Sequence, residues 1–203
     1  AVDERDEAYY IASTMKELKK SGRSYSDMAI LYRLNAQSRI LEEMLMKQGI
    51  PYKIYGGLKF YSRKEIKDVI ALLRVVQNGN DDISLKRIIN VPRRGIGKTT
   101  LDRIEQYAIS EETSMYKIIS MIDNYPEFYR SARNLKEFYY FIENMKTLAA
   151  NTDLVEFIES LIDKSGIVKE LEAEMTIEGR TRIENIKEFV SVAREFELTA
   201  EEK

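Results

Sequence analysis

The chain has 203 residues and a formal net charge of −2, and 44% of its residues are hydrophobic, which is enough for a sizeable core. It contains no cysteine and no histidine, which excludes disulfides, thiolate nucleophiles, histidine bases and the usual zinc sites. No apolar run approaches the roughly 18 residues that span a bilayer, and no charged, apolar-cored leader opens the chain, so we expect a cytoplasmic protein without a membrane partner.

Helix and strand patterns alternate through the first part of the chain. Residues 8–18 carry apolar side chains at helical spacing, and a second helical pattern spans 35–48, with Asn35 as its expected N-cap. The short apolar runs 28–32 and 52–55 are typical of buried strands. These patterns predict a segment with two strands and intervening helices.

Ser62 and Glu65 form the pattern of a capping box, which predicts the start of another helix. Strand, helix, strand and helix with short connections are typical of a parallel α/β sheet, but two strands are too few for a stable one. We therefore interpret residues 1–78 as part of a larger sheet domain.

Strand patterns end at the turn-forming cluster 78–82, and residues 79–203 are predicted to be an all-α domain. Its helical patterns run through 83–90, 98–110, 114–122, 131–149, 153–164, 167–174 and 177–196. The aromatic-rich piece 125–141 is interpreted as core rather than as a base-stacking platform, because it is not notably basic. The chain as a whole is predicted to be mostly α.

Positive charge is concentrated between residues 86 and 103. The basic residues there are Lys86, Arg87, Arg93, Arg94, Lys98 and Arg103, and Asp102 is acidic. Such a local patch is typical of a nucleic-acid backbone site. Gly97, Lys98 and Thr99 resemble the end of a nucleotide phosphate loop, but that loop needs glycine where this chain has Pro92. The nucleotide-loop interpretation is therefore excluded.

Two helical patterns meet at the turn Gly95-Ile96-Gly97, and the second helix is expected to begin near Lys98. This arrangement resembles the helix-hairpin-helix motif, in which loop amides and a helix N-terminus face a phosphate. The alternative is a tight corner whose glycines only permit close packing. The local motif leaves both interpretations open.

Three segments in a fixed order carry a family resemblance: 29–39 (AILYRLNAQSR), 56–68 (GGLKFYSRKEIKD) and 90–97 (NVPRRGIG). The segment 176–185 adds a fourth match near the end. Over essentially its whole length the chain resembles the UvrD/Rep/PcrA family of superfamily-one DNA helicases, most closely its PcrA branch. Three motifs in a fixed order identify a family far more specifically than a single motif does.

The resemblance implies a division into domains. In this family the motor has two RecA-like domains, each interrupted by a helical insertion. Residues 1–78 would be a partial RecA-like α/β segment, the start of domain 2A. Residues 79–203 would be its helical insertion, the duplex DNA-binding domain 2B with the helix-hairpin-helix-like motif.

The resemblance also implies a nucleotide site at one side of an ATP cleft. Tyr32 would stack on adenine. Arg33 would reach the γ-phosphate and act catalytically by stabilising charge in the transition state, because a planar, permanently charged fork suits phosphate oxygens. From the residues alone, Tyr32 packing and an Arg33 ion pair are the alternatives.

Two sets of residues would bind DNA in this family. Lys59, Arg63 and Lys64 would contact a single-stranded tail. The expected duplex contacts are Arg94, Gly95, Ile96, Gly97, Lys98, Thr99 and Thr100, which would hold phosphates without reading sequence. From the residues alone, solvated surface charge is the alternative for the first set.

The function implied is an ATP-dependent DNA helicase moving 3′ to 5′ in repair and replication, which uses ATP and Mg²⁺ and acts at single-strand/duplex junctions. The phosphate loop and the acidic Mg²⁺ motif have no counterpart in these residues, so we expect a fragment that is inactive alone, with no bound cofactor and no metal ligands. The alternative is a non-enzymatic regulatory module that binds DNA or a protein partner through the 2B domain.

Overall fold

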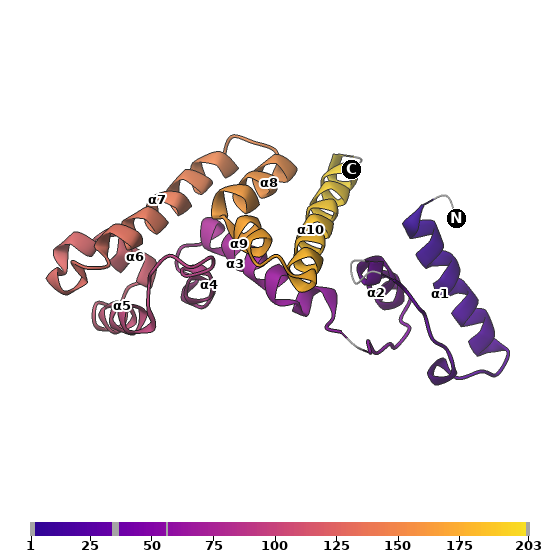
Figure 1. Cartoon of the computed structure of the whole chain (residues 1–203). Helices are drawn as coiled ribbons and strands as arrows, with labels where there is room; N and C mark the ends of the chain where they lie inside the picture. Colours follow the sequence, from indigo (N-terminus) through magenta and orange to yellow (C-terminus); the bar gives the residue numbers. More distant parts are fainter. Residues whose placement is uncertain (1–2, 34–36, 56, 202–203) are drawn as a thin grey trace. The chain divides into compact units, whose positions relative to one another are not determined.

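The computed structural model describes residues 3–33, 37–55 and 57–201. The chain divides into two compact units, Ala1–Arg63 and Lys64–Lys203. Figure 1 labels their helices along the chain. Each unit is described by itself.

Among its described residues, the first unit contains two α-helices, two short 3₁₀ helices and the segments between them (Figure 1). In chain order these are α1 (Glu4–Lys20), η1 (Tyr25–Asp27), α2 (Ser38–Lys47) and η3 (Phe60–Ser62). Helix α1 begins after Asp3, whose carboxylate accepts the amide of Asp6 at 2.7 Å and so satisfies one of the free N-terminal donors.

A small apolar cluster holds α1 against α2. Ala12 of α1, Leu45 of α2 and Ile50 are buried at its centre. Ile30 and Tyr52 pack against it from the two segments predicted as strands. Burial of apolar side chains is the main stabilising contribution in a unit this small.

The two predicted strands are not formed in the described residues. Residues 28–32 and 52–55 are neither helical nor hydrogen-bonded into a sheet, and the described ranges contain no strand. A strand gains its backbone hydrogen bonds only from a neighbouring strand, and these two segments do not pair with each other. The strand prediction was therefore wrong for this chain. The expected cap, Asn35, lies outside the described residues.

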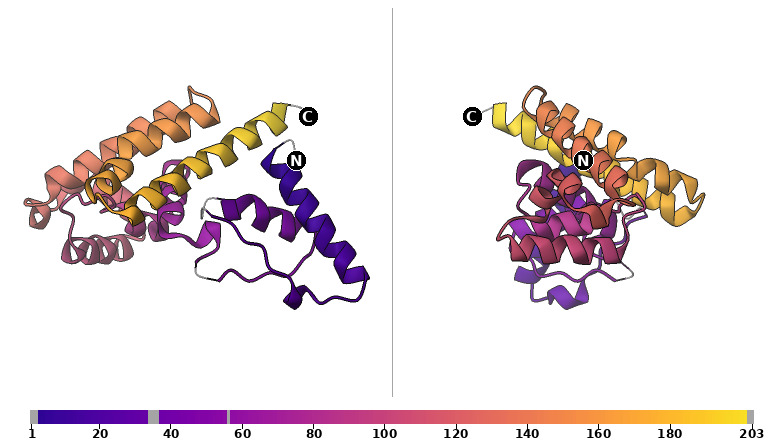
Figure 2. Two further views of the ribbon diagram at one scale, coloured as in Figure 1. Left: turned by 45° about the vertical axis from the view of Figure 1, so that its right-hand side comes forward. Right: turned by 90° about the vertical axis from the view of Figure 1, so that its left-hand side faces the viewer.

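The second unit is built from helices joined by loops, with no strand among its described residues. Its elements are α3 (Lys64–Gln77), α4 (Asp82–Ile88), α5 (Lys98–Ser110), α6 (Met115–Ser120), η4 (Ile122–Asn124), η5 (Pro126–Phe128), α7 (Ala132–Ala149), α8 (Leu154–Ser165), α9 (Ile167–Ala173) and α10 (Ile177–Glu201). Helices α7 and α8 form a hairpin, visible in both Figure 1 and Figure 2.

Helix α3 lies at the centre of this unit and packs against α4, α7, α8 and α10. Four of its side chains, Ile66, Val69, Leu72 and Val75, are completely buried. The core continues through the other helices with Leu85, Ile88, Ile104, Ile118, Leu135, Phe138, Ile142, Ile158, Leu161 and Ile186. The spacing of these residues follows the helical period, as the sequence predicts.

The predicted capping box at the start of α3 is not formed. The amide of Ser62 donates to the carbonyl of Lys59, and Glu65 is buried. The Glu65 carboxylate instead accepts a 2.6 Å hydrogen bond from the amide group of Asn185 in α10. A buried carboxylate needs such a partner, so this contact ties α10 to the first turn of α3.

The prediction of a mostly helical chain is confirmed. The structural division falls before α3, because α3 packs with the helices that follow it, and the predicted domain boundary after residue 78 stays a prediction. A helix-hairpin-helix is not established, since α5 packs mainly against α6. Among the described residues no helix is both long and apolar enough to cross a membrane.

The buried Glu65 and Asn185 pair leads to a stability prediction. Asn185→Ala should lower the free energy of unfolding by about 1–3 kcal/mol, because it removes a partner from a buried carboxylate. Urea unfolding followed by circular dichroism measures this change. Asn144→Ala, at an exposed position of α7, is the matched control and should change stability by less than about 0.5 kcal/mol. Equal effects of the two substitutions would contradict the prediction.

Candidate nucleic-acid interface

The loop between α4 and α5 is fixed from inside by one apolar side chain. Ile96 is only 1% exposed, although its neighbours Gly95 and Gly97 are exposed. Helix α5 begins directly after Gly97, which has an extended conformation and offers no side chain to cap the helix. The buried Ile96 therefore holds the start of α5 at the surface.

The first turn of α5 presents backbone donors without protein partners. The first backbone hydrogen bond of the helix runs from the amide of Leu101 to the carbonyl of Gly97 at 3.2 Å. The amides of Lys98, Thr99 and Thr100 precede it, and no acceptor for them is found among the described residues. Such a helix end carries partial positive charge and favours an anion.

Arg94 points into the protein. Its guanidinium donates to the carbonyls of Val91 at 2.8 Å, Ile88 at 3.1 Å and Ser165 at 3.2 Å. It also lies 5.6 Å from the ring centre of Phe138. Burial lowers the pKa of Arg94 to about 10, so the side chain is still charged at neutral pH. This position differs from the predicted phosphate contact, because carbonyl groups already occupy its donors.

The amides of the loop are also directed inward. Those of Arg94 and Ile96 donate to the side-chain oxygen of Asn90, at 2.7 and 3.3 Å. The amide of Arg93 donates to the carboxylate of Glu170 at 3.1 Å. The loop amides of Arg93, Arg94 and Ile96 are thus used internally, whereas those of Gly95 and Gly97, like the first amides of α5, have no acceptor among the described residues.

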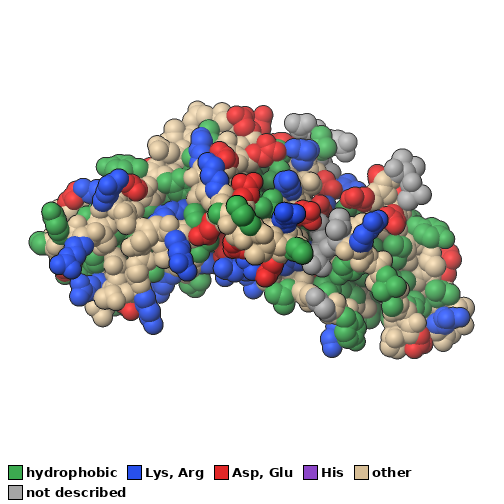
Figure 3. Space-filling view, viewed as in Figure 1, with side chains coloured by type: hydrophobic (Ala, Val, Ile, Leu, Met, Phe, Trp, Pro, Cys, Tyr) green, Lys and Arg blue, Asp and Glu red, His purple; other side chains and the backbone are tan. Residues whose placement is uncertain are grey.

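Only part of the predicted positive charge remains available. Lys86 pairs with Glu105. Arg87 pairs with Asp68 at 2.7 Å, although burial still raises the pKa of that carboxyl group. Between residues 86 and 103, all of which the structure describes, the cations that are exposed and make no ion pair are Arg93, Lys98 and Arg103. Figure 3 shows basic side chains along the lower edge of the helical unit, over α4 and α5.

Tyr32 and Arg33 follow one of the extended segments of the first unit. Both side chains are exposed, and the amide of Arg33 donates to the side chain of Gln37 at 3.2 Å. Tyr32 lines a cavity of about 750 Å³ between the extended segments and α2. Both residues are therefore accessible on this unit, and their nucleotide roles stay predictions.

Lys59, Arg63 and Lys64 have different surroundings. Lys59 is exposed, with its ammonium 4.9 Å from the ring centre of Tyr52. Arg63 is 8% exposed and donates to the hydroxyl of Ser38 at 2.7 Å within the first unit. Its burial does not fit the predicted contact with a DNA tail. Lys64, at the start of α3 in the second unit, is exposed.

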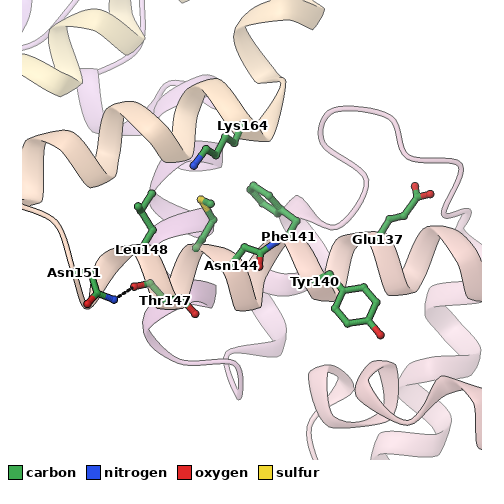
Figure 4. Close-up of a pocket in the computed structure, with 9 residues that line it drawn as sticks. Glu137, Tyr140, Phe141, Asn144, Thr147, Leu148, Asn151 and Lys164 are labelled. Atoms are coloured by element: carbon green, nitrogen blue, oxygen red, sulfur yellow. Dashed lines mark hydrogen bonds between the residues drawn. The ribbon is translucent and has the colours of Figure 1, made fainter.

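A shallow groove of about 670 Å³ runs along α7 beside the end of α8. Figure 4 shows Tyr140, Phe141 and Leu148 of α7 along it, with Lys164 of α8 on the opposite side. The acidic lining residue, Glu137, pairs with a neighbouring arginine on α7. Across residues 3–33, 37–55 and 57–201, no cluster of acidic, histidine or cysteine side chains could hold a metal ion. The groove therefore offers no evident catalytic chemistry.

Comparison with known proteins decides the family. Residues 1–203 match the family described as the UvrD-like helicase C-terminal domain. The chain belongs to this family. It is 45% identical over 197 residues to the ATP-dependent DNA helicase PcrA of Staphylococcus epidermidis, and 42% identical over the same length to that of Staphylococcus aureus. The alignments cover 97% of this chain but only 27% of each relative.

Sequence reasoning missed two features of the candidate DNA-binding residues. The inward positions of Arg94 and Arg63 have no sequence signal, because an arginine in a charged motif gives no indication of its direction. The role of Glu170 was also missed, since it lies in α9, far along the chain from the loop that it contacts. Asn90, four residues before Arg94, is a local signal that could have indicated inward loop amides.

The two glycines of the loop should respond differently to substitution. Gly95 has φ +70°, and an added Cβ would lie 2.8 Å from the side-chain nitrogen Nδ2 of Asn134, so Gly95→Ala should destabilise the chain by about 1–3 kcal/mol. Gly97 has φ −82° and open space around it, so Gly97→Ala should change stability by less than about 0.5 kcal/mol. Thermal unfolding of both variants measures the difference. Comparable melting temperatures would refute this account of the loop.

Proposed function

We propose that this chain is a part of an ATP-dependent DNA helicase that moves 3′ to 5′ in repair and replication. Residues 1–78 would begin domain 2A, and residues 79–203 would belong to the 2B insertion. The match of the whole chain to the helicase family and the names of its relatives support this proposal. ATP and Mg²⁺ would be cofactors of the whole protein, whose remaining sequence would supply the phosphate loop and the metal ligands.

The DNA role is carried by one observation, the uncapped N-terminus of α5. Its free amides and the side chains of Lys98, Thr99 and Thr100 would hold phosphates of the duplex, and Arg93 and Arg103 would add screened attraction. Gly97, which has open space around it, lets a phosphate approach the helix end closely. None of these groups is arranged to read a base edge, so binding would be independent of sequence.

In the proposed nucleotide role, the first unit supplies one side of an ATP cleft. Tyr32 would stack against adenine, and Arg33 would contact the γ-phosphate and stabilise the charge that develops during phosphoryl transfer. The exposure of both side chains and the cavity beside Tyr32 support this assignment. Lys59 and Lys64 are exposed and would contact the single-stranded tail.

The nucleotide assignment predicts where ATPase activity resides. The purified 203-residue chain should show no ATP hydrolysis with or without DNA. In the whole protein, Arg33→Ala should lower kcat by about 10³-fold, with a much smaller loss of nucleotide affinity, because its contact is made mainly in the transition state. A coupled ATPase assay and nucleotide titration measure the two effects. DNA-stimulated turnover by the chain alone would refute the proposed division of the site.

The DNA assignment predicts salt-dependent binding to duplex. Fluorescence anisotropy with two unrelated duplexes should give the same affinity for both, falling as salt rises because phosphate counterions are released. Lys98→Gln should make the slope of log K against log salt shallower by about 0.9, the value for one phosphate contact. The combined change Gly97→Ala and Lys98→Ala should weaken binding to both duplexes by the same factor.

Lys187→Gln removes an exposed lysine of α10 and is the matched control, which should leave the slope unchanged. Full affinity in the double variant, or a loss for one duplex only, would show that the turn at Gly97 is a packing corner. Absence of any duplex binding would favour a module that binds a protein partner instead.

A further inference from the structure

Arg94 lies where two helices end. Its guanidinium donates to carbonyls at the end of α4 and in the loop that follows, and to the carbonyl of Ser165, the last residue of α8. These are the carbonyls of Ile88, the last residue of α4, and of Ile89, Val91 and Pro92 after it, at 2.8 to 3.4 Å. The last carbonyls of a helix lack backbone partners and carry partial negative charge, which a cation stabilises.

These carbonyls form a cage around the side chain of Arg94, and a guanidinium fits this cage better than an ammonium would. It has five donors in a rigid plane, and its flat faces can stack on aromatic rings. Here its central carbon lies 5.6 and 5.8 Å from the ring centres of Phe138 and Phe141 on α7. A lysine would keep the charge, but three donors on one nitrogen could not reach both helix ends at once.

Two further contacts connect the loop 91–97 to the corner between α8 and α9. Gly166, at that corner, has φ +82°, and a Cβ added there would lie 3.4 Å from the ring of Pro92. Glu170 in α9 accepts the amide of Arg93. The loop before α5 thus rests on a corner that lies about seventy residues later in the chain.

We propose that Arg94 is a positioning residue for duplex binding: it locks the loop 91–97 onto the corner of α8 and α9, so that the first turn of α5 presents its amides and Lys98 to a phosphate. This inference rests on the proposed DNA-binding function. In this proposal Arg94 raises the affinity for duplex DNA although it does not contact a phosphate itself. It also makes the corner at Ser165 and Gly166 part of the DNA-binding device.

The test compares conservative changes at two arginines of the helical unit. Arg94→Lys keeps the positive charge but cannot fill the cage, and Arg180→Lys, at an exposed position of α10, is the matched control. For the full chain, anisotropy with a 20-base-pair duplex across a salt series should show that Arg94→Lys weakens binding about tenfold with an unchanged salt slope. Arg180→Lys should retain nearly the parental affinity. Hydrogen exchange should show faster exchange of the amides of 94 and 96 in Arg94→Lys.

Each other result overturns the inference. If Arg94→Lys binds like the parental chain while Arg94→Gln makes the salt slope shallower by about 0.9, Arg94 contacts a phosphate directly. If Arg94→Lys lowers only the melting temperature and leaves affinity intact, Arg94 serves the fold alone. If Arg94→Gln does not fold, the affinity and the melting temperature of Arg94→Lys alone distinguish the positioning role from these two alternatives. Failure of the parental chain to bind duplex would instead refute the proposed function itself, and the positioning role with it.

Discussion

The burial of α3 on nearly every side is the constraint on which the helical unit depends. An apolar side chain contributes about 1.5–3 kcal/mol when it is fully buried, and α3 buries apolar side chains along its whole length. Its first turns also bury two carboxylates, Glu65 and Asp68, and each needs a partner. Asn185 of α10 and Arg87 of α4 supply those partners. The helix therefore fixes both which elements surround it and where they lie.

The candidate interface follows from this arrangement. Because α4 is held against α3, its last carbonyls are fixed in space, and Arg94 connects them to the end of α8. Ile96 then anchors the loop in the core immediately before α5 begins. A polar cage and an apolar anchor act on the same short loop from inside. The outcome is a helix end whose donors are exposed and are not capped by any side chain of the protein.

The sequence predicts the helices of the second unit well, because spacing of apolar residues such as Leu135, Phe138 and Ile142 reports a buried helical face directly. It fails for the segment 28–32, since an apolar run indicates burial but not whether a neighbouring strand exists. It also cannot give the direction of an arginine. Arg63 and Arg94 lie in motifs that indicate DNA, yet both guanidinium groups bond to protein oxygens. Those bonds involve residues distant in sequence, such as Ser38 and Ser165.

The backbone at Gly97 has a consequence for natural sequence variation. Any L-amino acid can adopt its φ of −82°, and nothing nearby would meet a side chain. Folding alone therefore permits this position to drift among related chains, whereas the left-handed backbone at Gly95 restricts that position to glycine on structural grounds. If glycine persists at both positions across distant relatives, selection for glycine at position 97 must come from whatever approaches the helix from outside. The pair thus separates the evolutionary demands of folding from those of binding.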